Sequence, residues 1–139
     1  MTTVIVSGHG NFATGITSSL DLILGVPQNY EAIDFVKGSN IEELERKFND
    51  AIAKHKEDQI IILVDLLSGS PFNIAIKKSM EHENIRVLYG TNLGMLLELC
   101  AKIEFGGDVE ETINTLVETG KTQVGEFDKS LFDEDDEEE

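Results

Sequence analysis

Gln59-Ile-Ile-Ile-Leu-Val-Asp65 is the stretch of this sequence that decides its fold. Its five central residues are all apolar and mostly β-branched, with no alternation of polar and apolar side chains. That pattern is typical of a strand buried on both faces, in the middle of a parallel sheet. The run ends at a carboxylate, Asp65, and Leu66-Leu-Ser-Gly-Ser70 follows it as a loop. We therefore expect a central strand that carries an acidic side chain at its carboxyl end.

Strands and helices are predicted to alternate on both sides of this central run. Short apolar runs mark the strands, and apolar residues spaced three or four apart mark the helices. The expected strands cover residues 3–8, 30–36, 59–65, 85–89 and, as a short last strand, Thr122–Phe127; the expected helices cover residues 12–23, 41–52, 70–81, 93–103 and 109–119, the last one ended by Gly120. Such alternation predicts an α/β fold, a doubly wound three-layer sandwich whose mainly parallel sheet has the order 2-1-3-4.

Length and charge exclude several classes of protein. The chain has 139 residues, enough for one domain, and part of its net charge of −16 comes from residues 133–139, which are all acidic. A negative body with a negative tail repels phosphate backbones and anionic lipid, so we expect no nucleic-acid binding and no membrane insertion. A single cysteine and the lack of a charged leader before Lys37 predict a cytoplasmic protein. We expect a domain over residues 1–127 and a disordered acidic tail over residues 128–139.

Two loops are expected to meet at the carboxyl edge of the sheet, where the winding of a doubly wound fold reverses. They are Ser7-Gly-His-Gly-Asn11 after the first strand and residues 65–70 after the third. Each candidate has an ordinary interpretation: His9 as a polar residue near a helix start, and Asp65 as a cap of its own loop. Together they favour a pair, in which Asp65 accepts the Nδ1–H of His9 and leaves Nε2 as a free lone pair. That is the arrangement of a nucleophilic or basic imidazole.

Groups that bind an anion surround this expected pair. The helices after both loops would direct unpaired amide groups and a positive dipole end toward it. Ser70, expected to cap the second of these helices, adds a hydroxyl, Gly69 allows close approach of the backbone, and Gly8 and Gly10 leave the His9 ring unshielded. We assign Ser70, Gly69 and Gly10 as candidate phosphate-binding residues. No lysine or arginine lies in either loop, which suits a phosphoryl group that is passed on rather than stored.

Three other phosphate-binding patterns fit less well. Gly8-x-Gly10-x-x-Ala13, with Asp34 near the end of the second strand, matches a dinucleotide fingerprint, but a histidine at its second position would crowd the pyrophosphate. Residues 10–17 look like a Walker A run without its lysine, which removes the main charge on the β- and γ-phosphates. A receiver domain would need carboxylates after the first strand to hold Mg²⁺, and residues 7–9 supply none. A small nucleotide- or anion-binding module, with His9 as a hydrogen-bond donor only, stays an open alternative.

Five segments of the sequence together resemble the EIIA component of the mannose-family phosphoenolpyruvate-dependent sugar phosphotransferase system (PTS). The most specific of them is Leu63-Val-Asp-Leu-Leu-Ser-Gly-Ser-Pro-Phe-Asn73. The others are Val4-Ile-Val-Ser-Gly-His-Gly10, Ile33-Asp-Phe35, Gly90-Thr-Asn-Leu-Gly-Met95 and Glu118-Thr-Gly120. The resemblance extends over about residues 3 to 127.

The resemblance implies a cytoplasmic phosphocarrier, a phosphotransferase that works through a phosphohistidine. It would take a phosphoryl group from phospho-HPr onto Nε2 of His9 (a tele-phosphohistidine) and pass it to EIIB, which phosphorylates the sugar entering through membrane EIIC and EIID. Asp65 matches the aspartate that orients the histidine, and Ser70 matches a hydroxyl beside the phosphate. No metal or nucleotide cofactor is expected, because the incoming phosphoryl group is already on a high-energy histidine. The implied homodimer exchanges its last strand, Thr122–Phe127, between subunits.

Some features of the sequence point elsewhere or to no function. A similar fold occurs in the phosphotransfer subunit of dihydroxyacetone kinases, which is the nearest alternative with the same chemistry. The chain resembles EIIA relatives without an attached EIIB domain, and its residues identify no sugar. The other two histidines, His55 and His82, lie beside charged neighbours and are expected to be solvated residues at helix ends. Cys100 continues an apolar stripe and is expected in the core.

Overall fold

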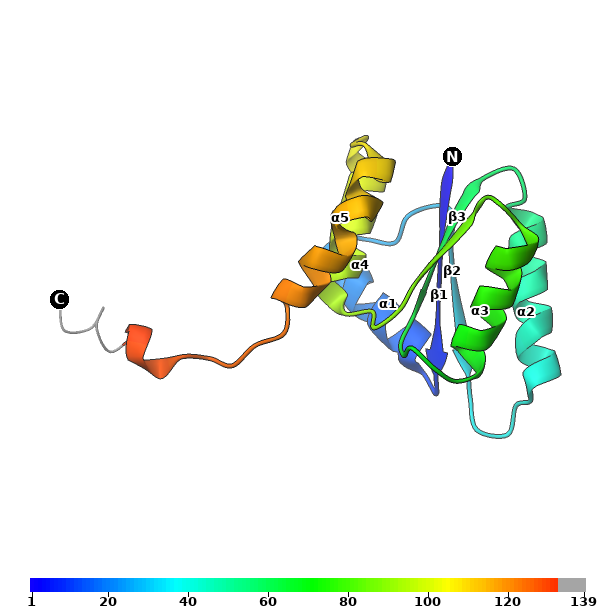
Figure 1. Ribbon diagram of the computed structural model, residues 1–139, viewed down its shortest axis with the longest axis horizontal. Helices are drawn as coiled ribbons and strands as arrows, with labels where there is room; N and C mark the ends of the chain where they lie inside the picture. The colour runs from blue at the N-terminus through cyan, green and yellow to red at the C-terminus, as the bar shows by residue number, and fades with distance from the viewer. Residues whose placement is uncertain (133–139) are drawn as a thin grey trace.

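Four parallel strands form the central sheet of the protein, in the order β2-β1-β3-β4 (Figure 1). This computed structural model describes residues 1–132. The strands are Thr2–His9 (β1), Tyr30–Phe35 (β2), Gln59–Val64 (β3) and Ile85–Leu88 (β4). The helices are Phe12–Ile23 (α1), Ile41–Lys54 (α2), Ser70–Glu81 (α3), Leu93–Phe105 (α4) and Val109–Thr122 (α5). The predicted three-layer α/β fold and the strand order 2-1-3-4 are confirmed.

The helices cover the two faces of the sheet unequally. In Figure 1, α1, α4 and α5 lie on one side of the strands, and α2 and α3 lie on the other. Side chains of β3 supply both cores: Ile61 and Leu63 pack toward α1, α4 and α5, while the alternating residues Ile60, Ile62 and Val64 pack toward α2 and α3. All five are fully buried, so the central run of apolar residues is a strand covered on both faces, as predicted.

The register of β1, β2 and β3 aligns their carboxyl ends at one edge of the sheet. Ser7 of β1 pairs with Val64, the last residue of β3, and His9 pairs with Phe35, the last residue of β2. Because the strands are parallel, the loops that follow β1 and β3 leave the sheet at the same edge. This edge carries the two loops that the sequence indicated as the functional site.

The expected last strand over Thr122–Phe127 does not form in the described chain. Helix α5 runs three residues longer than expected, through Thr122, and the following residues leave the body of the molecule in irregular conformation (Figure 1). Gly120 lies within the helix and does not end it. Its lack of a side chain leaves room for α4, since a Cβ there would lie 2.5 Å from the sulfur of Met95. A strand also needs to lie along the edge of a sheet, and in this chain residues 123–127 lead away from both edges, β2 and β4.

The acidic tail expected over residues 128–139 lies partly outside the described chain. Residues 129–132 form one helical turn, and residues 133–139 are outside the described part. Within residues 1–132, no helix is both long enough and apolar enough to cross a bilayer.

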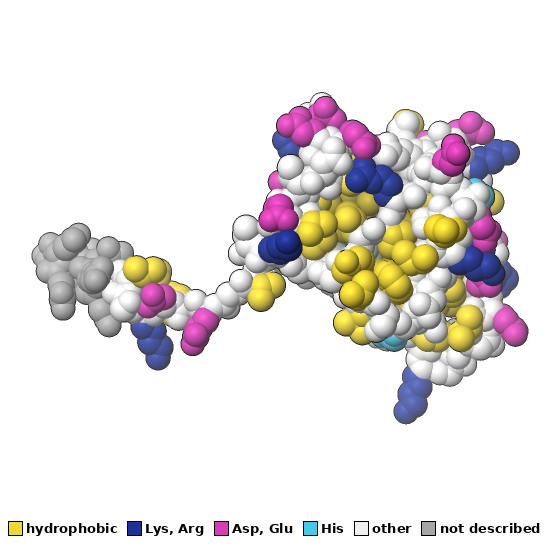
Figure 2. All heavy atoms as spheres, in the orientation of Figure 1, with side chains coloured by type: hydrophobic (Ala, Val, Ile, Leu, Met, Phe, Trp, Pro, Cys, Tyr) yellow, Lys and Arg dark blue, Asp and Glu magenta, His cyan; other side chains and the backbone are white. Residues whose placement is uncertain are grey.

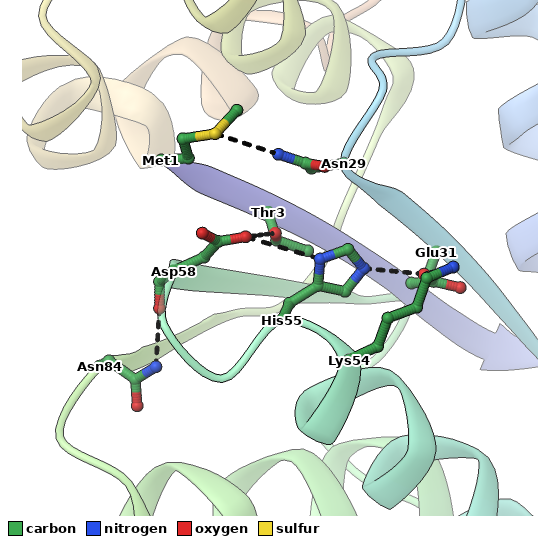
Figure 3. A network of polar contacts seen from close by, with 8 residues as sticks. All are labelled: Met1, Thr3, Asn29, Glu31, Lys54, His55, Asp58 and Asn84. Atoms are coloured by element: carbon green, nitrogen blue, oxygen red, sulfur yellow. Dashed lines mark hydrogen bonds and ion pairs between the residues drawn. The ribbon is translucent and has the colours of Figure 1, made fainter.

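A polar network closes the amino end of the sheet, around His55 at the end of α2 (Figure 3). The prediction that His55 is solvated was wrong, since only 8 % of its side chain is exposed. Its Nε2 lies 2.9 Å from Glu31 on β2, and its Nδ1 lies 3.5 Å from Asp58 in the turn before β3. Thr3 of β1 donates a further hydrogen bond of 2.8 Å to Asp58. The network therefore joins α2 to β1, β2 and the turn before β3. The exposed His82 has the surroundings that were expected of both histidines.

Two buried groups lie in the core between the sheet and α1. The Cys100 thiol is fully buried as predicted, and burial raises its pKa to about 12. Burial also raises the pKa of Tyr30 to about 12, although a hydrogen bond of 2.8 Å with the Thr17 hydroxyl opposes that rise. Both groups are therefore neutral over the physiological range of pH and act as packing residues.

Candidate functional site

The structure brings His9 and Asp65 together, as the sequence predicted. His9 is the last residue of β1, and Asp65 directly follows β3, its neighbour in the sheet. One carboxylate oxygen of Asp65, Oδ2, lies 3.0 Å from Nδ1 of His9 and accepts the His9 backbone N–H at 2.9 Å. The other oxygen accepts the N–H of Leu66 at 2.9 Å. Three hydrogen bonds thus fix the carboxylate against the imidazole.

This contact sets the protonation pattern of the imidazole. A carboxylate can only accept, so Nδ1 of His9 carries the proton that it donates to Asp65, and Nε2 of the neutral ring is left with a lone pair. The His9 side chain is 42 % exposed, whereas that of Asp65 is 17 % exposed. The nitrogen that Asp65 leaves free therefore belongs to a partly exposed ring, and the carboxylate that contacts this ring is largely shielded from water.

Gly69 lies directly against the free nitrogen of His9. A Cβ at this position would be 2.6 Å from Nε2, and the backbone has a φ of +95°, in the left-handed region that favours glycine. Both space and conformation therefore call for glycine here. Gly69, rather than Ser70, is the N-cap residue of α3, and it makes no side-chain cap, so the expected capping role of Ser70 was wrong.

The beginning of α3 lies next to the same nitrogen, because Gly69 is the N-cap residue of this helix. Ser70 is the first residue of the helix, and the amide of Asn73 donates to the Gly69 carbonyl at 2.9 Å, which is the first bond of the helix. Amides that precede this bond have no acceptor within the helix, as at any helix start. The half-buried Ser70 side chain sits at this same turn. An anion on Nε2 would therefore lie next to Gly69, at the amino terminus of α3.

Helix α1 offers less to an anion than the sequence suggested. The carboxylate of Asp34, at the end of β2, accepts the Thr14 amide at 3.0 Å and the Thr14 hydroxyl at 2.6 Å. The first turn of α1 thus already holds a negative group of the protein itself. The same contacts occupy Asp34, which in the dinucleotide interpretation would have bound a ribose. Of the two helix starts, α3 is the one that fits a phosphoryl group.

The glycines around His9 serve purposes that the sequence did not indicate. A Cβ on Gly8 would lie 2.9 Å from Cγ of Asp65 and 2.9 Å from Phe12, so this glycine makes room for the carboxylate rather than leaving the ring unshielded. Gly10 has a φ of +60°, and its amide donates to the Phe35 carbonyl at 2.8 Å. Because that amide is committed to β2, Gly10 forms the turn after His9 and does not fit the expected phosphate-binding role.

Apolar side chains rim the site on the surface. Val36 after β2 and Leu66 and Leu67 after β3 are exposed, and the Phe35 ring lies with its centroid 6.3 Å from that of His9. Among residues 1–132, no group of three or more His, Cys, Asp or Glu side chains is arranged to hold a metal ion. The arrangement can present one imidazole nitrogen, next to a helix start, to a partner with an apolar contact surface.

Comparisons with known proteins show which family and which proteins this chain is similar to. The family model EIIA-man, described as the PTS system fructose IIA component, matches residues 3–117. The chain is 36% identical over 126 residues to the PTS system mannose-specific EIIAB component of Escherichia coli K12, covering 89% of this chain and 39% of that protein. It is 35% identical over 100 residues to the PTS system fructose-specific EIIA component of Bacillus subtilis, covering 71% of this chain and 68% of that protein.

Solved structures give the same result for the fold. A crystal structure of phosphotransferase system component EIIA from Streptococcus agalactiae matches with a TM-score of 0.81 and 31% sequence identity, covering 91% of this chain and 98% of that one. A PTS IIA protein associated with the fucose utilization operon of Streptococcus pneumoniae matches with a TM-score of 0.81 and 25% identity, covering 94% of this chain and 96% of that one.

Proposed function

Because the chain belongs to the mannose-type EIIA family of the sugar phosphotransferase system, we propose that it carries a phosphoryl group on His9 between two proteins. The donor is phospho-HPr, and the acceptor is an EIIB protein that phosphorylates a sugar entering through membrane EIIC and EIID. The carrier works in the cytoplasm. The observation that supports this proposal best is the 3.0 Å contact between Nδ1 of His9 and Asp65, on a His9 side chain that is 42 % exposed.

The proposed reaction transfers the phosphoryl group from one histidine to another. The lone pair on Nε2 of His9 attacks the phosphorus atom of phospho-HPr, a new P–N bond forms, and the electron pair of the old P–N bond returns to the HPr histidine. The His9 ring keeps its Nδ1 proton and gains positive charge as the bond forms, which the Asp65 carboxylate stabilises. Attack by a nucleophile of EIIB on the same phosphorus atom reverses these changes at His9.

The start of α3 holds the phosphoryl group while it is on His9. The phosphoryl oxygens lie next to Gly69, where the first-turn amides of α3 and the Ser70 hydroxyl donate hydrogen bonds to them. These donors are neutral or carry only a partial charge, so they stabilise the transferring group without trapping it as a lysine or arginine would. Val36, Leu66 and Leu67 form the apolar surface on which the donor and the acceptor dock in turn.

Radiolabelled phosphoenolpyruvate with enzyme I and HPr tests the proposal. We expect an acid-labile, alkali-stable label on the wild-type protein and on His55→Gln and His82→Gln, and no label on His9→Ala. Label that persists on His9→Ala, or a wild-type protein that takes no label, would contradict the proposal. Thermal stabilisation by a nucleotide in the absence of labelling would instead support the nucleotide-binding module.

A homodimer completes the proposal. Strand β4 is an edge of the sheet, and Figure 2 shows apolar side chains gathered on the face between α3 and α5. Tyr89, Val117 and Val124 line one hollow and are exposed, and Phe127 is exposed on the segment that leaves the body. Residues 122–127 of a second copy, inserted along β4, would cover both the open edge of this strand and the apolar surface beside it. Light scattering should show a dimer for the full chain and a monomer for a chain that ends at Gln123; a full-length monomer would contradict this part.

A further inference from the structure

The end of β2 contacts His9 and the loop after it from the side opposite to Asp65. Strands β2 and β3 flank β1, so Asp65 follows one neighbour of the His9 strand, while Asp34 and Phe35 end the other. We propose that Asp34 and Phe35 are positioning residues for phosphoryl transfer, which hold the backbone around His9 as Asp65 holds its ring. This inference rests on the proposed function of His9 as the phosphoryl acceptor.

Asp34 fixes the segment that begins immediately after the His9 loop. Its two carboxylate oxygens accept the amide and the hydroxyl of Thr14 at 3.0 and 2.6 Å. Asn11, the N-cap residue of α1, makes no side-chain cap of its own, so Asp34 supplies from β2 the acceptor that a cap would normally provide. Since His9 is only three residues before Phe12, a shift of the first turn of α1 moves the loop that carries the imidazole.

Phe35 holds the same loop through its backbone and its ring. Its carbonyl accepts the Gly10 amide at 2.8 Å, which closes the turn directly after His9. Its ring meets the His9 ring edge to face, with centroids 6.3 Å apart and an interplanar angle of 63°. The ring also packs against the core between the sheet and helices α2 and α3, so it is a supported wall rather than a loose side chain.

These contacts restrain a motion that Asp65 leaves free. The hydrogen bonds of Asp65 reach the amide and Nδ1 of His9, whereas the amide of Gly10 is held by the Phe35 carbonyl of β2. The turn of Gly10, with its positive φ, is where the chain would pivot between β1 and α1. Because transfer between two proteins depends on the placement of Nε2 to within a fraction of an ångström, a loose pivot would slow the chemical step more than it weakens docking.

The kinetics of His9 phosphorylation by phospho-HPr test this proposal. We expect Asp34→Ala to lower kcat by about tenfold and to change KM by less than about twofold, because the misplaced nucleophile still lies on an intact docking surface. Asp34→Asn keeps an oxygen for the Thr14 amide and should recover at least about half of the wild-type kcat. Phe35→Leu should lower kcat in the same way, and it leaves Asp34 in place if Asp34→Ala does not fold.

Asp108→Ala is the matched control. The Asp108 carboxylate accepts the Glu111 amide at 3.1 Å at the start of α5, so it makes the same kind of helix contact at a distance from His9. It should lower thermal stability about as much as Asp34→Ala and leave kcat unchanged. A second readout is the ¹⁵N spectrum of His9, in which Asp34→Ala should broaden the Nδ1–H resonance that Asp108→Ala leaves sharp.

The outcomes separate this inference from the proposed function. If the wild-type protein takes label on His9 but Asp34→Ala and Phe35→Leu transfer at the wild-type kcat, the positioning role is wrong and the carrier function stands. Loss of kcat in Asp108→Ala to the same extent would also overturn it, since the effect would then follow stability alone. If the wild-type protein takes no label, the carrier function itself fails.

Discussion

Two histidines in this molecule are paired with carboxylates, at opposite ends of the same sheet. At the carboxyl end, Nδ1 of His9 lies 3.0 Å from Asp65, and 42 % of the His9 side chain is exposed. At the amino end, Nε2 of His55 lies 2.9 Å from Glu31 and Nδ1 lies 3.5 Å from Asp58, with 8 % of the side chain exposed. The closest contacts are equally short; what differs is how many nitrogens are occupied and whether the ring can be reached.

The difference shows that a histidine–carboxylate pair does not by itself make a nucleophile. An imidazole attacks through the lone pair of an unoccupied nitrogen that a substrate can approach. Both nitrogens of His55 face carboxylate oxygens, so its contacts serve to join α2, β2 and the turn before β3. We therefore expect changes at the carboxyl end to alter phosphoryl transfer and changes at the amino end to alter stability.

The largest effect is expected for Gly69→Ala, which would block the free Nε2 that distinguishes His9 from His55. A methyl group there would lie 2.6 Å from Nε2. Because it occupies the approach of the phosphorus atom, we expect the rate of His9 phosphorylation by phospho-HPr to fall by at least roughly a thousandfold. Rapid-quench measurement of the label on the protein determines this rate.

Gly38→Ala separates crowding of Nε2 from backbone strain. Gly38 has a φ of +93°, close to the +95° of Gly69, but a Cβ there would meet no atom within 4 Å. Both variants should lose stability in urea because of the positive φ, Gly69→Ala the more because of its clash with His9, while Gly38→Ala keeps the transfer rate within about twofold of wild type. Equal losses of transfer in both variants would mean that strain, and not access to Nε2, governs the site.

Asp65→Asn should have the next largest effect. The amide can accept from Nδ1 of His9 but cannot stabilise the positive ring that forms during transfer, so we expect the rate to fall by roughly a hundredfold with the fold intact. Asp58→Asn makes the same chemical change beside His55 and should leave the rate unaltered. An unchanged rate in Asp65→Asn would remove the role assigned to that carboxylate.

The carboxyl end of the sheet was the more predictable of the two regions. His9 and Asp65 follow strands that local sequence patterns identify, and the strand order of a doubly wound fold places those strands side by side. Once the buried strands are identified, the pairing of His9 with Asp65 can be predicted without knowledge of individual contacts. The hydrogen-bond commitments of Gly10 and Asp34 were not predictable in this way, because each depends on the register between β1 and β2.

The amino end could not be predicted for a physical reason. Glu31, His55 and Asp58 come from the start of β2, the end of α2 and a turn, and the polar neighbours of His55 and Asp58 in the sequence suggest exposure. Tertiary packing brings them together, and it buries His55 while leaving Glu31 and Asp58 partly exposed. The prediction of the last strand was wrong for a similar reason. Residues 122–127 have a strand-like sequence, but a strand also needs an open edge to pair with, and the proposed edge belongs to a second copy.

His55→Gln tests the amino end of the comparison. Glutamine can satisfy only part of the contacts with Glu31 and Asp58, so we expect the free energy of unfolding to fall by about 2 kcal/mol. Urea unfolding followed by circular dichroism measures this change. His82→Gln is the control, because His82 is exposed at the end of α3, and it should change stability by less than about 0.5 kcal/mol.

Phosphoryl transfer by folded His55→Gln should equal that of wild type. A stable His55→Gln protein with slow transfer would show that the amino-end network reaches the site through the sheet, and the two regions would then not be independent. A variant as stable as wild type would show that the network contributes no net stability.

The smallest effect is expected for Ser70→Ala at the start of α3. Its hydroxyl is one of several proposed donors to the phosphoryl group, and the backbone amides of the same turn remain when it is removed. The loss of one neutral hydrogen bond to a phosphoryl oxygen, worth about 1 kcal/mol, predicts a fall in transfer rate of about fivefold. Ser68→Ala, in the same loop but before Gly69, should leave the rate unchanged. A hundredfold loss in Ser70→Ala would place the hydroxyl, and not the helix start, as the main group that holds the phosphoryl oxygens, and His9 would then differ from His55 by a side chain as well as by access.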